Sequence, residues 1–200
     1  MKFDDPINEW NKFIQSGNLD ALSGIYFQFY DMMFTYGLKH TSDKQAVEDT
    51  IQDVYMNLIK YRKNIGEVKN LTGYLISTFR RQLLLTINKQ MKMIPSGKLQ
   101  EENFEFFKSE DQDISEKENL EQLHTIIMQC IGKLPSKQRE IVFLRFENGI
   151  SYEEIAVMLQ ISVDSCYKSV YRSIKTIRTE VEKIFGKGAN IILWFMSKGK

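Results

Sequence analysis

The residues with the clearest chemical potential are basic, and they gather in two stretches of the chain. Between residues 60 and 92, eight basic side chains stand against a single acid, Glu67, a net charge of +7. A second polar and basic row recurs between residues 163 and 183. Because the whole chain carries a net charge of only +1, any binding of a polyanion such as nucleic acid must come from these local patches.

The second row contains side chains that could reach base edges or phosphates of DNA from one side of a helix. These candidates are Ser165, Tyr167, Lys168, Ser169, Tyr171, Arg172 and Lys175. Apolar residues recur between them every three or four positions, which predicts a buried stripe on the same helix. The stripe consists of Val163, Cys166, Val170, Ile174, Ile177 and Val181. Within it, Cys166 is better explained as a small core residue than as a redox sensor.

Catalytic and metal-binding chemistry find little support in the sequence. His40 and His124 lie in different halves, neither beside a plausible nucleophile, and the two cysteines do not form a metal-binding pair. Asp49 and Asp53, one helical turn apart, could hold a metal ion or act as an acid/base pair, but a solvated or partner-binding face explains them more simply. We therefore expect no catalytic residue, no metal, no cofactor and no small-molecule substrate.

The elements that position these residues are expected to be helices. The chain is 42% hydrophobic and 26% charged with three prolines among 200 residues, which favours helix and excludes fibrous or globally disordered chains. Between residues 10 and 92 the apolar spacing predicts three or four helices. Short polar side chains precede three of them as candidate caps: Asn18 or Ser16, Ser42 or Asp43, and Asn70 or Thr72.

The second half has a more specific pattern. Helices are expected at 120–134 and 136–146, and Ser151 and Glu154 have the spacing of a capping box that opens a short helix. After a turn at 160–162, a longer helix is expected from 163 to about 183. A short helix, a tight turn and a second helix, with the small Ala156 allowing close crossing, is the helix-turn-helix pattern of DNA-binding proteins.

A reversal of charge separates the two halves. From residue 101 to residue 121, nine acids and two lysines give a net charge of −7, and Pro95-Ser96-Gly97 interrupts the preceding helix. We therefore expect an all-α chain of two small helical domains joined by an acidic flexible linker at 94–118. Phe104, Phe106 and Phe107 are unusual for a spacer, and they either pack transiently on a neighbouring domain or serve a dedicated docking role.

Two stretches resemble bacterial sigma factors of the sigma-70 family. Residues 47–58, VEDTIQDVYMNL, resemble the core of region 2, and residues 134–146, LPSKQREIVFLRF, followed by GISYEEIA at 149–156, resemble region 4. With these regions alone and a short linker, the chain is similar to a group 4, or extracytoplasmic-function, sigma factor. The resemblance implies a region 2 domain at 1–93, the linker at 94–118, a region 4 helix-turn-helix domain at 119–183, and a tail at 184–200 of unknown role.

The resemblance also implies a role for each surface. The clamp coiled coil of core RNA polymerase would be bound by Asp49, Gln52, Asp53 and Asn57. The −10 promoter element would be held by Lys63, Asn64, Lys69, Asn70, Arg80, Arg81 and Lys89, and the −35 element by the polar row of the 163–178 helix. Further implied partners are the polymerase flap and an anti-sigma factor. The implied protein is not an enzyme, is cytoplasmic and is not inserted in the membrane.

Some positions depart from the family pattern. Gln160 stands in the turn where the family usually has glycine, so we expect its backbone to take the left-handed conformation that glutamine tolerates poorly. Arg81, Tyr167 and Ser169 also differ, which leaves the promoter sequence open. Two other hypotheses stay open at this point: a stand-alone helix-turn-helix regulator that binds duplex DNA without polymerase, and an interaction protein whose DNA surfaces are degenerate.

Overall fold

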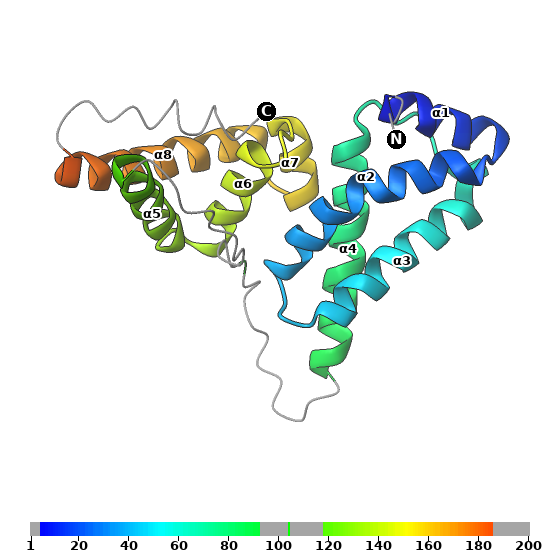
Figure 1. The fold of residues 1–200 in the computed structure, drawn as a ribbon, viewed down its shortest axis with the longest axis horizontal. Coiled ribbons are helices and arrows are strands. Elements are labelled where there is room, and N and C mark those ends of the chain that lie inside the picture. The colour runs from blue at the N-terminus through cyan, green and yellow to red at the C-terminus, as the bar shows by residue number, and fades with distance from the viewer. Residues whose placement is uncertain (1–4, 93–103, 105–117, 186–200) are drawn as a thin grey trace. The chain divides into compact units, whose positions relative to one another are not determined.

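The computed structural model describes residues 5–92, Phe104 and residues 118–185 (Figure 1). The described residues form helices and turns without a strand, which confirms the expected all-α class. The chain divides into two compact units, Met1–Gln100 and Glu101–Lys200, and each is described by itself. The part of the chain that the structure describes has no helix long and apolar enough to span a membrane.

Within residues 5–92, unit 1 contains four α-helices and one short 3-10 turn. They are α1 (Pro6–Ser16), α2 (Leu19–Leu38), α3 (Lys44–Tyr61), η1 (Arg62–Asn64) and α4 (Leu71–Lys92). Of the candidate caps, the side chains of Asn18, Asp43 and Asn70 accept the hydrogen bonds, each at 3.0 Å from a backbone N–H of the following first turn. Local side-chain acceptors therefore start α2, α3 and α4 as expected.

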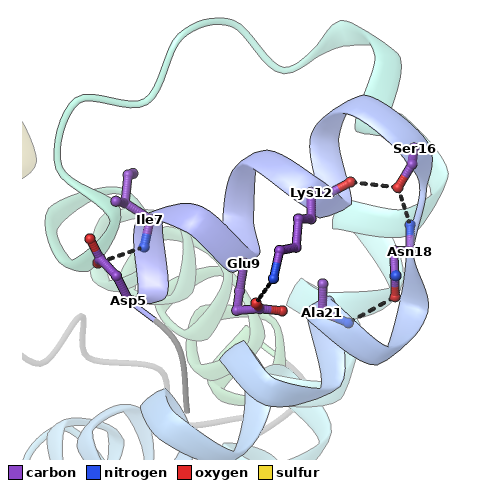
Figure 2. A network of polar contacts seen from close by, with 7 residues as sticks. All are labelled: Asp5, Ile7, Glu9, Lys12, Ser16, Asn18 and Ala21. Carbon is purple, nitrogen blue, oxygen red and sulfur yellow. Dashed lines mark hydrogen bonds and ion pairs between the residues drawn. The ribbon is translucent and has the colours of Figure 1, made fainter.

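The joint between α1 and α2 is closed by polar contacts (Figure 2). The Ser16 hydroxyl donates to the Lys12 carbonyl at 2.7 Å and accepts from the Asn18 N–H at 3.2 Å. Gly17 between them takes a left-handed φ of 76°, and the Arg62 guanidinium donates to the Ile14 carbonyl at 2.8 Å. Arg62, one of the residues in the basic stretch, is therefore engaged in capping the carboxyl end of α1.

The core of unit 1 is formed by one face of each helix. Its largest fully buried side chains include Trp10 and Phe13 of α1, Tyr36 of α2 and Phe79 of α4. Helices α2 and α3 cross closely at Gly37, where a Cβ atom would lie only 2.6 Å from Val47 Cγ1. Unit 1 is thus a packed helical bundle whose remaining faces are exposed.

In unit 2 the described residues form α5 (Glu118–Gly132), α6 (Ser136–Phe146), α7 (Tyr152–Leu159) and α8 (Val163–Phe185). Helix α8 packs against α5, α6 and α7. The predicted capping box is present: the Ser151 hydroxyl accepts from the Glu154 N–H at 3.2 Å, and the Glu154 carboxylate accepts from the Ser151 N–H at 3.1 Å. Most of the expected linker and tail, residues 93–103, 105–117 and 186–200, lies outside the described residues.

Candidate nucleic-acid and protein-binding faces

The first candidate face lies on α3 and carries the four residues expected to bind polymerase. Asp49, Gln52, Asp53 and Asn57 are all exposed, whereas Val47, Ile51, Val54 and Leu58 on the other side of the helix are buried. Gln45 donates to the Asp49 carboxylate at 2.8 Å and so orients it. Spacings of three and four residues put the four side chains on one side of the helix, so the structure brings them together. We call this surface the α3 face.

Met56 belongs to the α3 face and was missed by the sequence analysis. Its side chain is 64% exposed, and at ~100° per residue it lies about 180° from Val47, opposite the buried stripe. An apolar side chain at the centre of a polar face is typical of a contact point for another protein. The available signal was that Met56 is out of phase with the stripe formed by Val47, Ile51, Val54 and Leu58.

The second candidate face comprises the loop after α3 and one side of α4. Lys63 and Asn64 in η1, Lys69 in the loop, and Arg81 and Lys89 on α4 are exposed. Arg80 is half-buried. The side-chain oxygen of Asn70 accepts from the Gly73 N–H at 3.0 Å, so Asn70 has a structural role at the start of α4. This oxygen therefore already accepts one hydrogen bond within unit 1 before any ligand binds.

The structure does not place all of the residues expected to bind the −10 element close together. At a rise of ~1.5 Å per residue, Lys89 lies about 27 Å along α4 from Leu71, well away from the loop. Arg81, Leu85 and Lys89 follow each other at four-residue spacing on one side of α4, and the Leu85 side chain is 60% exposed. The set therefore divides into a loop group and an α4 group, and Leu85 is an apolar member that the sequence analysis missed.

The third candidate face is the exposed side of α8, in the helix-turn-helix formed by α7 and α8. Gln160 between the helices has φ 53° and ψ 49°, so the turn requires the left-handed backbone expected from the missing glycine. Six of the seven candidates on α8 are exposed, and Lys168 at their centre lies about 180° from the buried Ile177. We call this surface the α8 face.

The expected stripe and row on α8 need correction at their edges. Ser169, expected to point outward, is half-buried, and Ser173 is fully buried with its hydroxyl donating to the Ser169 carbonyl at 2.8 Å. Val163 and Ile174, expected in the buried stripe, are half-buried. The serines are covered because α8 packs against three helices rather than one, and the Ser173 hydroxyl lies 3.4 Å from the Gln138 side-chain oxygen of α6.

Several side chains of the α8 face already have partners within unit 2. The Lys168 ammonium forms an ion pair with Asp164 at 2.7 Å, and the Ser165 hydroxyl lies 2.8 Å from the Ser162 hydroxyl. The ion pair is exposed, so it is weak, worth ~1 kcal/mol or less. A nucleic-acid phosphate would therefore replace the Asp164 carboxylate at small cost. Asp164 was not among the predicted residues, although its four-residue spacing to Lys168 was visible.

An aromatic stack supports the start of the α8 face. The Tyr167 ring packs against the Tyr152 ring of α7, with centroids 4.1 Å apart. The Arg145 guanidinium lies over the same Tyr152 ring, 4.7 Å from its centroid. Arg145 also donates to the Ile150 carbonyl at 3.1 Å. The stack fixes the orientation of Tyr167, whose side chain is 49% exposed. Tyr152 was missed because this contact joins two helices.

The described residues contain no cluster of histidine, cysteine, aspartate or glutamate that could hold a metal ion. Cys130 and Cys166 are buried free thiols, and burial raises the pKa of each. A thiol with a raised pKa is a weaker nucleophile at neutral pH because less thiolate is present. Cys166 thus lies in the core of unit 2, as its place in the apolar stripe predicted.

Comparison with known proteins connects these faces to one family. The family model for sigma-70, region 4 matches residues 124–177, which include the helix-turn-helix. The RNA polymerase sigma-H factor of Pseudomonas aeruginosa is 22% identical over 172 residues, covering 82% of this chain and 88% of the relative. The ECF RNA polymerase sigma-E factor of Escherichia coli is 33% identical over 75 residues, which cover 36% of this chain and 39% of the relative.

Solved structures show the same fold. The sigma factor RpoE of Bartonella quintana, solved with the anti-sigma factor NepR, has a TM-score of 0.57 at 16% identity, covering 82% of this chain and 98% of that one. CnrH, solved with the cytosolic domain of CnrY, has a TM-score of 0.54 at 15% identity, covering 90% and 98% of the two chains. The region 4 match and the similarity to sigma-H over both units support a sigma factor of the sigma-70 family, and the sigma-E match supports the extracytoplasmic-function kind.

Proposed function

We propose that this alternative sigma factor divides promoter recognition and polymerase binding among its three exposed faces. Residues 1–93 form the unit that binds core polymerase and the −10 element, and residues 119–183 form the unit that reads the −35 element. The observation that carries the proposal is the α8 face, a polar and basic surface on the second helix of a helix-turn-helix, in a chain similar to sigma-H over both units.

The α3 face is the proposed contact for the clamp coiled coil of the polymerase. Two exposed carboxylates, Asp49 and Asp53, lie on the same side of α3 as the apolar side chain of Met56, and Gln52 and Asn57 extend the polar rim. A small apolar centre with a charged rim is suited to a protein partner, because the centre gains from leaving water and the rim selects a basic partner. An isolated metal or proton-transfer site would require further ligands around the two carboxylates.

The loop after α3 and the basic side of α4 are the proposed contacts for the −10 element. Lys63, Asn64 and Lys69 lie at the loop, where an extruded base would be held, and Arg80, Arg81 and Lys89 would bind backbone phosphates. Taking a base out of its stack costs a few kcal/mol, which contacts in the loop must offset. Phosphate contacts make the binding dependent on salt.

The α8 face is the proposed reader of the −35 element in the major groove. Lys168, Arg172 and Lys175 supply positive charge, and Tyr167 and Tyr171 supply apolar surface of the kind that contacts thymine methyl groups. A stand-alone regulator is the less favoured alternative, because the sigma-H match extends over both units and the α3 face has no part in binding duplex DNA alone. The proposed protein performs no catalysis itself and acts where RNA polymerase acts, in the cytoplasm.

An anti-sigma factor is a further proposed partner. One structural relative, the Bartonella RpoE, was solved in complex with the anti-sigma factor NepR, and a second, CnrH, was solved with the cytosolic domain of CnrY. Exposed apolar side chains on unit 1, such as Phe27 and Met56 at 65% and 64% exposure, offer surface that such a partner could cover.

The test compares binding to a promoter with and without core RNA polymerase from the source organism. A sigma factor should give a polymerase-dependent footprint over both promoter elements and bind the same duplex weakly when alone. A tight footprint formed by the free chain, unchanged by polymerase, would contradict the proposal and favour the stand-alone regulator.

A further inference from the structure

Phe104 stands in the acidic stretch expected to be linker, yet its side chain is fully buried in unit 2. Its ring packs edge-on against the ring of Phe143 in α6, with centroids 5.5 Å apart and planes at 60°. Its backbone is held as well: the Phe104 N–H donates to the Ser136 hydroxyl at 2.8 Å, and its carbonyl accepts from Arg139 Nε at 2.8 Å.

The same arginine ties this residue to the turn between α5 and α6. Arg139 Nη1 donates to the Gly132 carbonyl at 2.9 Å and to the Leu134 carbonyl at 2.8 Å. One guanidinium therefore donates hydrogen bonds both to the carbonyls at the end of α5 and to the carbonyl of Phe104. Hydrogen bonds from a charged donor are among the stronger ones in proteins. A buried ring held by two backbone hydrogen bonds is a fixed point of unit 2.

We propose that Phe104 is an anchor that clips the segment between the units onto unit 2, so that the tether between them ends at residue 103. From Lys92, the end of α4, the chain takes 12 peptide steps to Phe104, against 26 steps to Glu118, the start of α5. At ~3.6 Å per step, the longest possible span from Lys92 to the point where the chain joins unit 2 is about 43 Å with the anchor at Phe104 and about 94 Å if the chain joins at Glu118.

The anchor has a consequence for promoter recognition, which rests on the function proposed above. The tether limits how far apart the −10 and −35 elements can lie when one molecule binds both. A shorter tether also raises the effective concentration of the second unit once the first is bound, provided that it still spans the distance. The choice of promoter spacing is therefore partly encoded by Phe104, Ser136 and Arg139.

The test inserts 14 Gly/Ser residues at two places in the full chain, after residue 98 or after residue 110. Dyes are attached to Gln28→Cys on α2 and Thr176→Cys on α8, both exposed positions outside the proposed faces, and energy transfer between them is measured on single molecules. With the anchor in place, the insertion before Phe104 lowers the transfer efficiency and the insertion after it leaves the efficiency unchanged. An equal loss from both insertions would overturn the proposal.

Phe104→Ala gives the complementary test. Provided that circular dichroism shows unit 2 still folded, the variant should lose transfer efficiency, while the control Phe107→Ala, which leaves Phe143, Ser136 and Arg139 unchanged, should keep the wild-type value. A folded Phe104→Ala chain with the wild-type efficiency would overturn the anchor. If the variant unfolds, the two insertions still decide. Because the readout needs neither polymerase nor DNA, the anchor and the proposed sigma function can fail separately.

Discussion

The α3 face and the α8 face are built in the same way but differ in their internal contacts. Both lie opposite a buried apolar stripe of one helix. On the α3 face, Gln45 merely orients Asp49, and Met56 stays exposed at the centre. On the α8 face, Lys168 is paired with Asp164 and Tyr167 is stacked on Tyr152. The α3 face can therefore bind a partner without breaking a contact of Met56. On the α8 face, a partner that binds Lys168 or Tyr167 must replace the contact with Asp164 or Tyr152.

Met56→Lys should produce the largest loss of affinity for core polymerase, because it places a charge within the α3 face. We expect the affinity for core polymerase to fall by about 3 kcal/mol, roughly 150-fold, as for a central contact residue. Unit 1 should keep its stability, since the side chain is 64% exposed. Titration of labelled protein with core polymerase measures this. Leu19→Lys, at 59% exposure on α2, is the control, and an equal loss from both variants would show that Met56 has no special place.

On the α8 face, Arg172 and Lys168 should differ because Lys168 already has an internal partner. Arg172→Ala should weaken binding of the holoenzyme to −35 DNA by about 2 kcal/mol, roughly 30-fold, and Lys168→Ala by less. Asp164→Asn removes the competing carboxylate and should raise the affinity up to about fivefold, the value of an exposed ion pair. Fluorescence anisotropy with a −35 duplex distinguishes these cases. A loss of affinity in Asp164→Asn would mean that Asp164 serves the DNA contact directly.

The direction of the α8 face depends on the left-handed turn at Gln160. Gln160→Gly should stabilise unit 2 by about 1 kcal/mol, because glycine adopts this backbone conformation without a steric penalty. Urea unfolding followed by circular dichroism gives the change in the free energy of unfolding. Gln160→Ala is the matched control and should bring no gain, so equal stabilisation by both variants would contradict the explanation.

The last prediction concerns the reactivity of Cys166 on the buried side of α8. Burial raises the pKa of Cys166, so less thiolate is present at pH 8 than in an exposed cysteine. Iodoacetamide should therefore modify native Cys166 much more slowly than the urea-unfolded chain, with mass spectrometry following the adduct. Rapid modification of the native protein would show that α8 separates readily from α7.

Features decided by neighbours in sequence could be predicted, and features decided by distant contacts could not. The caps Asn18, Asp43 and Asn70 follow from residues a few positions apart, and the left-handed turn at Gln160 was expected because the resembled family usually has glycine there. The burial of Phe104 against Phe143 depends on a partner 39 positions away in the sequence.

The same reasoning explains the limits of the site prediction. The positions of Asp49, Gln52 and Asp53 on one exposed side follow from helical periodicity. The stack of Tyr167 on Tyr152 joins two helices, and the burial of Ser173 depends on α6, so neither could be inferred from the period of α8. Which residues contact polymerase or DNA remains a prediction from the family resemblance.

The central claim is that the α3 face couples this chain to RNA polymerase, and run-off transcription tests it most directly. Purified chain, core polymerase and a promoter from the source genome are compared for the wild type, Asp49→Ala/Asp53→Ala, and the control Asp20→Ala/Asp31→Ala, which removes two exposed carboxylates of α2. We predict promoter-specific transcripts from the wild type and the control, and at least a tenfold loss from the α3 variant. Full transcription by the α3 variant, or none by the wild type with active polymerase, would contradict the account.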